Sequence, residues 1–380
     1  MLNLPLSGIK RIESIVINND EYISLSQGAL KINGIPQQIK DHLKEIFDTT
    51  KTDFYQSAWG IMPLREKIAQ VINKKNNTNI LPKQILVTHG CTGAIAVTFS
   101  TILEPGDEVL IPEPAYLAYT SITKIVRCKP VFVSCTSNSK NKFWDLDIEK
   151  IKAAATPKTK ILIFSNPWNP LGLVVNKKAI LDLLEWCSKK QIYILIDEAY
   201  KDYVFSNDFE SCADLINQSE WLIKANTFSK NLGMSGWRIG YLVVPEKLCV
   251  AIGQAQDAML NCPNIPAQYA ALYALDHPKI IQNFHTIVKN NLEITKKELE
   301  PLIKEKIFEY QNPDGGFYLF LKTQQKDSND LCLNLLNQAK VSLVPGIYFG
   351  QSGESFARLC FARDPLVLKE GLKRIKNFLK

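Results

Sequence analysis

The chain has 380 residues, and its 45 basic and 38 acidic side chains give a net charge of +7. A content of 46% hydrophobic and 22% charged residues excludes intrinsic disorder, and no apolar run reaches the ~18 to 20 residues of a membrane-spanning helix. The basic residues are spread along predicted helices, so neither nucleic acid nor a membrane is expected as a partner.

The cysteine and histidine residues indicate the cellular compartment and whether a metal site is expected. The nine cysteines are an odd number without a C-x-x-C pair, which is typical of reduced thiols in a cytosolic protein. The four histidines show no metal-ligand spacing, so no metal site is predicted. Residues 1–6 lack the basic start and long apolar stretch of a signal peptide, and we therefore expect a cytoplasmic protein.

From residue 84 the sequence alternates β-branched runs with amphipathic stretches, which predicts an α/β fold around a mostly parallel sheet. The predicted strands are residues 85–87, 108–111, 130–133, 160–164, 193–196, 222–225 and 238–244. The predicted helices are residues 62–75, 91–103, 176–190, 247–260 and a long stretch over 267–305.

After residue 305 the order of elements changes. Strand-like runs at 316–321 and 358–362 flank a helix near 329–338 and a short strand at 341–344, and a helix over 365–379 follows. This order predicts a smaller α+β unit that packs with the N-terminal segment. We expect a large domain over residues 46–285 and a small domain made of residues 1–45 plus 286–380.

A loop rich in small and hydroxyl residues contains Lys230, and Arg238 follows eight residues later. A lysine acts as a nucleophile toward carbonyl groups when burial or positive neighbours lower its pKa, and an arginine suits bidentate recognition of phosphate. Together the two residues indicate a phosphorylated carbonyl cofactor. A surface lysine paired with an acid is the competing interpretation.

Two further polar segments directly follow predicted strands. Asp197 comes after four apolar residues, at the carboxyl end of a strand, where parallel sheets bind ligands. Its alternative role is to cap a helix. The segment 165–172 contains Asn169 between two prolines, which restrict the backbone more than an ordinary turn requires.

With these motifs in family order, the sequence resembles the class I aminotransferases, pyridoxal-phosphate enzymes of fold type I. The resemblance implies a seven-stranded sheet in the large domain, and it extends over nearly the whole chain. The matching segments are Asn169-Pro170-Leu171-Gly172, Asp197-Glu198-Ala199-Tyr200, Ser229-Lys230, Gly236-Trp237-Arg238-Ile239-Gly240 and Ala357-Arg358-Leu359.

The resemblance implies that pyridoxal 5′-phosphate is the cofactor and assigns roles around it. Lys230 would bind the cofactor's aldehyde and then move the substrate proton as general base and acid. Asp197 would pair with the pyridine nitrogen, and Tyr200 and Asn169 would contact the 3′ oxygen. Tyr116 would stack on the ring. The residues implied for the phosphate are Arg238, Thr227, Ser229, Cys91 and Thr92.

Substrate binding and assembly are likewise implied by the resemblance. Arg358 would hold the substrate α-carboxylate, and Asn169 and Gly28 would also contact the substrate. Tyr55 would reach the phosphate in a neighbouring subunit, which implies a homodimer with shared active sites. The expected substrates are an amino acid and a 2-oxo acid, used in a ping-pong reaction through pyridoxamine phosphate.

One departure from the family pattern affects the substrate side. Where relatives read G-x-P, this chain has Gly28-Ala29-Leu30-Lys31. As a hypothesis, Lys31 faces the side-chain carboxylate of a dicarboxylic substrate, although a solvated lysine is an equal alternative. The sequence also leaves open a same-fold lyase, such as a C–S lyase or an aminocyclopropane-carboxylate-synthase-like enzyme, because fold does not fix function.

Overall fold

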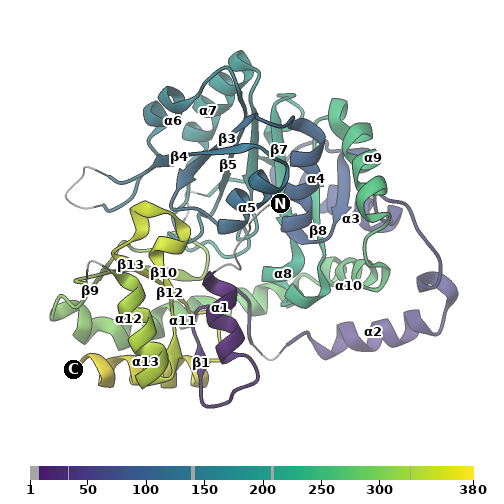
Figure 1. Cartoon of the computed structure of the whole chain (residues 1–380). Coiled ribbons are helices and arrows are strands. Elements are labelled where there is room, and N and C mark those ends of the chain that lie inside the picture. The colour runs from purple at the N-terminus through teal and green to yellow at the C-terminus, as the bar shows by residue number, and fades with distance from the viewer. Residues whose placement is uncertain (1–7, 33, 138–141, 207–208, 326) are drawn as a thin grey trace.

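The structure is a computed structural model, and it describes residues 8–32, 34–137, 142–206, 209–325 and 327–380. Figure 1 shows its main sheet flanked by helices, with a smaller group of strands and helices below it. Across the described ranges, the helices are either too short or too polar to cross a bilayer.

The main sheet has seven strands in the order β2-β8-β7-β6-β5-β3-β4. All are parallel except β8, which runs antiparallel to both of its neighbours, so the predicted mostly parallel sheet is confirmed. Its strands are β2 (Ile85–Thr88), β3 (Glu108–Glu113), β4 (Lys129–Ser134), β5 (Thr159–Ser165), β6 (Tyr193–Asp197), β7 (Leu222–Thr227) and β8 (Gly240–Val243).

Both faces of this sheet are buried except along the edge strand β4, because alternate residues of the other strands enter two separate cores. In β5, for example, Ile161 and Ile163 pack in one core while Leu162 and Phe164 pack in the other. One face packs with α4 (Gly90–Ile102), α5 (Leu117–Ile125) and α9 (Cys249–Leu260), and the other with α3 (Met62–Asn76), α7 (Lys177–Lys190) and α10 (Ile265–Asp276).

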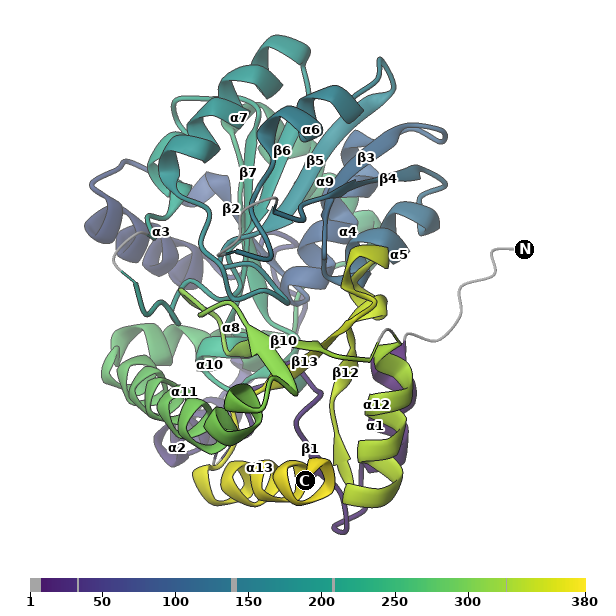
Figure 2. The ribbon, with the colours of Figure 1, turned by 90° about the vertical axis from the view of Figure 1, so that its left-hand side faces the viewer.

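A second, antiparallel sheet has the order β12-β13-β10-β9. Its strands are β9 (Phe308–Tyr310), β10 (Tyr318–Thr323), β12 (Val344–Pro345) and β13 (Phe356–Cys360). Helices α11 (Lys279–Lys304), α12 (Ser328–Asn334) and α13 (Pro365–Leu379) lie around it (Figure 2). The α+β character predicted for the chain after residue 305 is therefore confirmed.

The N-terminal segment joins this second group of elements. Strand β1 (Ile23–Ser24) pairs in parallel with β11 (Val341–Ser342), and α1 (Gly8–Val16) packs on Leu336 and Tyr348. The next helix, α2 (Gln37–Phe47), contacts α10 instead and spans the boundary predicted at residue 46. The division into two domains stays a prediction.

Three features of the secondary structure differ from the sequence prediction. The stretch 267–305 forms two helices, because Pro278 follows the end of α10 and interrupts the helical hydrogen bonding. The strand predicted from Arg238 begins at Gly240, since Arg238 adopts a left-handed φ of 54°. Five helices were not predicted from the sequence, namely α1, α2, α5, α6 (Ile148–Ala154) and α8 (Phe228–Asn231), the last of which lies in the segment expected to be a loop.

Candidate active site

The candidate active site is a cavity of about 620 Å³ at the carboxyl ends of the main-sheet strands. Twelve of the thirteen residues predicted from the sequence line it, although they come from segments throughout the chain. They are Gly28, Cys91, Thr92, Tyr116, Asn169, Asp197, Tyr200, Thr227, Ser229, Lys230, Arg238 and Arg358.

The exception is Tyr55, which does not line this cavity and is 82% exposed. It lies between α2 and α3, in a segment whose side chains are largely exposed. The expected role of Tyr55 in a neighbouring subunit requires a second chain, so it stays a prediction.

Lys230 stands on the short helix α8 (Phe228–Asn231), directly after β7. Thr227 caps this helix by accepting a hydrogen bond from the Ser229 amide. The Lys230 Nζ donates to the carbonyl oxygen of Gly28. Burial lowers the pKa of Lys230 to about 8, with Arg358 adding to the effect. Lys230 is therefore a partly buried amine that loses its proton near pH 8, well below the ordinary value for a lysine.

Asp197 is buried at the end of β6 and is held by several donors. Its Oδ1 accepts from the Ala199 amide at 3.0 Å and its Oδ2 from the Tyr119 hydroxyl at 2.9 Å, while the Cys91 thiol also bonds to this carboxylate. Burial raises the pKa of Asp197, whereas these hydrogen bonds and Lys230 oppose that rise. The carboxylate is thus fixed in orientation and suited to a cationic partner.

The first turn of α4 and Arg238 can hold an anion. Cys91 and Thr92 lie in the first turn of α4, whose free N–H groups suit an anionic ligand. The Arg238 guanidinium lies against the same turn, so close to Gly90 that an added Cβ there would meet Nη2 at 2.8 Å. Gly90, with a φ of +72°, therefore leaves room for a ligand's approach to this cation.

Arg358, in β13, is 2% exposed and stacks between two aromatic rings, those of Tyr318 and Phe349. Its Nη1 donates to Asn169 Oδ1 at 3.0 Å and its Nη2 to the Ser26 carbonyl at 2.6 Å. Its buried Nε has no hydrogen-bond partner among the described residues. A buried guanidinium with a free donor suits a carboxylate ligand.

Sequence reasoning missed several residues of this cavity. Tyr119 follows Tyr116 by three positions, and this helical spacing is the signal that could have indicated it. The Tyr318 hydroxyl lies 2.7 Å from the Tyr200 hydroxyl, a contact between two distant parts of the chain that no local pattern indicates. The other missed lining residues include Ile9, Lys10, Glu13, Gln27 and Ser165.

Lys31 is not among the residues that line the cavity. Its Nζ lies 3.9 Å from Glu13 Oε2, and its side chain is about half exposed. The contact with a substrate side chain that the sequence suggested for Lys31 thus stays a prediction.

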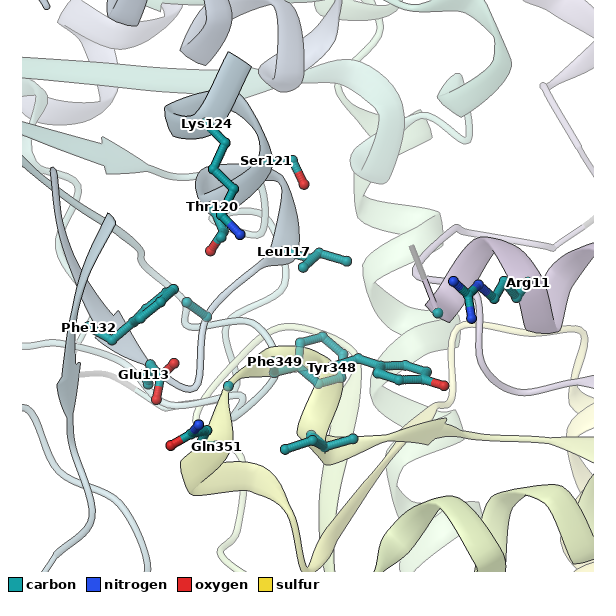
Figure 3. Close-up of a pocket in the computed structure, with 14 residues that line it drawn as sticks. Arg11, Glu113, Leu117, Thr120, Ser121, Lys124, Phe132, Tyr348, Phe349 and Gln351 are labelled. Atoms are coloured by element: carbon teal, nitrogen blue, oxygen red, sulfur yellow. The ribbon is translucent and has the colours of Figure 1, made fainter. Parts of the chain in front are cut away.

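A second cavity, of about 540 Å³, lies between α5, the first turns of α1 and residues 347–351 (Figure 3). Its lining includes Leu117 and Phe132, and none of the residues predicted for the active site. Helix α1 contributes to both cavities, since Glu13 lines the first and Arg11 the second.

Known proteins are similar to this chain over most of its length. A family model described as "Aminotransferase class I and II" matches residues 20–375. An aspartate aminotransferase of Sulfolobus acidocaldarius is 32% identical over 350 residues, covering 90% of this chain and 86% of that protein. An aromatic-amino-acid aminotransferase of Thermococcus litoralis is 31% identical over 378 residues, covering 98% and 96%.

A solved structure gives the same result for the fold. The crystal structure of an aspartate aminotransferase from Thermotoga maritima matches with a TM-score of 0.87 and 30% sequence identity. The match covers 99% of this chain and 97% of that one. The fold-type-I architecture predicted from the sequence is therefore confirmed.

Proposed function

Because the chain belongs to the class I and II aminotransferase family, we propose that it transfers an amino group from an amino acid to a 2-oxo acid with pyridoxal 5′-phosphate bound in the main cavity. The observation that carries this proposal is the convergence of Lys230, Asp197 and Arg358 on one cavity. The same-fold lyase is not favoured, because the matched relatives are named aminotransferases.

The donors around the cavity fit this cofactor. Arg238, Thr227 and the first turn of α4 offer a cation, a hydroxyl and N–H groups for the phosphate, and Asp197 offers a carboxylate for the ring nitrogen. When bound, pyridoxal phosphate supplies an aldehyde for the substrate's amino group and a ring that takes up the electrons left at Cα. We assign Tyr116 to the face of that ring.

In this proposal Lys230 is the group that transfers protons. Its lowered pKa leaves more of the amine unprotonated near pH 8 than for an ordinary lysine, so that it can take up the substrate's Cα proton, and the same group then returns that proton. Tyr200 lies beside it, with the ring centre 6.0 Å from the Lys230 Nζ. Burial raises the pKa of Tyr200 well above its ordinary value, so its hydroxyl stays protonated and serves as a donor.

Arg358 orients the substrate. A substrate α-carboxylate would meet the guanidinium at its unpartnered Nε side, while Asn169 and Ser26 hold the other two nitrogens. Exclusion of water from this buried site strengthens the pairing. The relatives' names mention both aspartate and aromatic amino acids, so donors of both kinds belong in the test.

We also propose that two copies of the chain form a homodimer with shared active sites. Support comes from exposed apolar side chains in one segment, with Phe47 at 56%, Phe54 at 67% and Tyr55 at 82% exposure. Phe47 also lines a cavity that includes Arg238. Such a surface is typical of an interface.

All nine cysteines are free, which supports the predicted cytoplasmic location.

The test uses purified protein and its visible spectrum. We expect a yellow band that L-aspartate, L-glutamate or an aromatic amino acid removes and that a 2-oxo acid restores, with the oxidised donor identified as a 2-oxo acid. The Lys230→Ala variant should lose at least about 10²- to 10⁴-fold of this turnover, the usual contribution of proton transfer. Ammonia or a cleaved product, with no change in the band, would instead establish a lyase.

A further inference from the structure

Glu13 is a buried acid on α1 for which the reaction above has no role. Its side chain is 7% exposed and lines the main cavity. Its Oε1 accepts hydrogen bonds from Ser24 Oγ at 2.8 Å and from Ser26 Oγ, and its Oε2 faces Lys31. A buried carboxylate is costly unless it is bonded in this way, so these contacts fix α1 to the segment that follows it.

Ser26 connects this acid to the substrate arginine. Its hydroxyl bonds to Glu13 and lies 2.7 Å from Ser342 Oγ, while its carbonyl oxygen accepts from Arg358 Nη2 at 2.6 Å. The contacts therefore run from Glu13 through Ser26 to Arg358. Arg363 holds the same segment by donating to the carbonyls of Ser24, Gln27 and Ala29.

We propose that Glu13 is a positioning residue for carboxylate binding, an inference that rests on the proposed function of Arg358. Glu13 holds Ser26 so that the Ser26 carbonyl fixes the plane of the Arg358 guanidinium. Because two N–H groups must meet two carboxylate oxygens at once, a small rotation of this plane weakens binding.

The contacts through Ser26 link helix α1, which lines part of the cavity, to Arg358. Helix α1 carries Ile9 and Lys10 to the cavity together with Glu13. The position of α1 and the orientation of Arg358 therefore depend on each other, and a substrate carboxylate that orders Arg358 also favours the seated position of α1. Glu13 acts on binding of the α-carboxylate and leaves proton transfer at Lys230 unchanged.

The experiment compares amino acids with amines that differ only by the α-carboxylate. Holoenzyme variants Glu13→Ala, Glu13→Gln and Ser26→Ala are assayed with L-glutamate against 4-aminobutanoate and with L-phenylalanine against phenethylamine. Glu21→Ala is the matched control, because Glu21 ties the same N-terminal segment to Lys340 and is not bonded to Ser26.

For Glu13→Ala we expect KM for both amino acids to rise about tenfold with kcat within about twofold, as for loss of a hydrogen bond to a charged group. Rates with the two amines should not change. Glu13→Gln keeps an oxygen acceptor for the serines and should retain most of the affinity. Should Glu13→Ala fold poorly, Ser26→Ala provides the same comparison, because it keeps the carbonyl and loses the hydroxyl.

A second measurement separates positioning from general destabilisation. Combined with Arg358→Ala, the Glu13→Ala change should have no further effect on KM, because the residue through which it acts is gone. Equal losses with amino acids and amines, or additive effects in the double variant, would overturn the inference. Wild-type protein without transamination would overturn the proposed function itself, whereas active wild type with unaffected Glu13 and Ser26 variants would reject only the role of Glu13.

Discussion

The two ends of the main cavity are built from the chain in different ways. At the Asp197 end, functional side chains follow neighbouring strands of one sheet, with Asp197 ending β6 and Lys230 standing just after β7. At the Arg358 end, the arginine donates to the Ser26 carbonyl across 332 residues of sequence. The first end is placed mainly by the main sheet, although Lys230 also donates to the Gly28 carbonyl, whereas the second end depends on docking of the N-terminal segment.

This difference separates two kinds of expected effect. Under the proposed function, changes at the Asp197 end should lower the rate of the chemical step, because the groups there would act on the cofactor and on the transferred proton. Changes at the Arg358 end should weaken substrate binding and should respond to residues well away from the substrate. A variant at the Asp197 end that changed only KM, or one at the Arg358 end that changed only kcat, would contradict this division.

The largest effect is expected from Asp197→Asn. Loss of the buried charge should lower kcat about 10²- to 10³-fold, the range for one preorganised electrostatic group. Cofactor content, measured by absorbance, should persist because the phosphate contacts are unchanged. Asp182→Asn, on the exposed side of α7, is the control. An Asp197→Asn enzyme with normal kcat would remove Asp197 from the reaction.

The next effect concerns pH. Because the pKa of Lys230 is lowered to about 8, the cofactor-free protein should take up pyridoxal phosphate about tenfold faster for each pH unit gained below 8, with a plateau above it. Stopped-flow absorbance measures this rate. A rate that keeps rising to pH 10 would mean that Lys230 keeps the ordinary pKa of a lysine.

The same lowered pKa predicts a stability difference for the cofactor-free protein. Below pH 8 Lys230 is protonated in both the folded and the unfolded chain, and its buried charge lowers the free energy of unfolding by up to about 3 kcal/mol. As pH rises from 8 toward 10.5, the folded protein sheds this proton first and the penalty disappears. Lys230→Met should therefore be more stable than wild type at pH 7, and the two should converge near pH 10.5 in denaturant titrations.

A smaller effect is expected at the other end of the cavity from Arg358→Lys. Lysine keeps the positive charge but loses the planar fork, so KM for amino acid and 2-oxo acid should rise about 10- to 100-fold while kcat changes little. Steady-state kinetics with both substrates measures this split. If kcat fell instead and KM stayed constant, the two ends would not differ in the way described.

The smallest effect is expected from Tyr119→Phe. This change removes one donor to Asp197, but the Ala199 amide and the Cys91 thiol remain. We expect about 1 kcal/mol, or roughly a fivefold loss in kcat/KM. Kinetics at several pH values measures it. A loss as large as that of Asp197→Asn would make Tyr119 a primary member of the site.

The sequence predicted the Asp197 end better than the Arg358 end for a physical reason. Strands of a parallel sheet end at one edge, so a residue that directly follows a buried run can be placed without the rest of the structure. Asp197 and Lys230 are of this kind. Ser26 contacts Arg358 only through tertiary docking, and Glu13 contacts Ser26; neither residue stands in a motif.

The fold shows the same division. All seven main-sheet strands were predicted, because both of their faces are apolar, whereas α1 was missed although Ile12 and Val16 pack against Leu336. The break between α10 and α11 was missed because the apolar periodicity continues on both sides of Pro278. Local patterns indicate a helix, and a single proline decides where it ends.

The contact between Ser26 and Arg358 also has a consequence for synthesis on the ribosome. Translation makes the β1 region early, yet its partners in β11 and β13 emerge only after more than 300 further residues. The main sheet can fold before then, since all its strands precede residue 244. A nascent chain can thus assemble the Asp197 end first, and the proposed binding of a substrate carboxylate by Arg358 becomes possible only when translation is nearly complete.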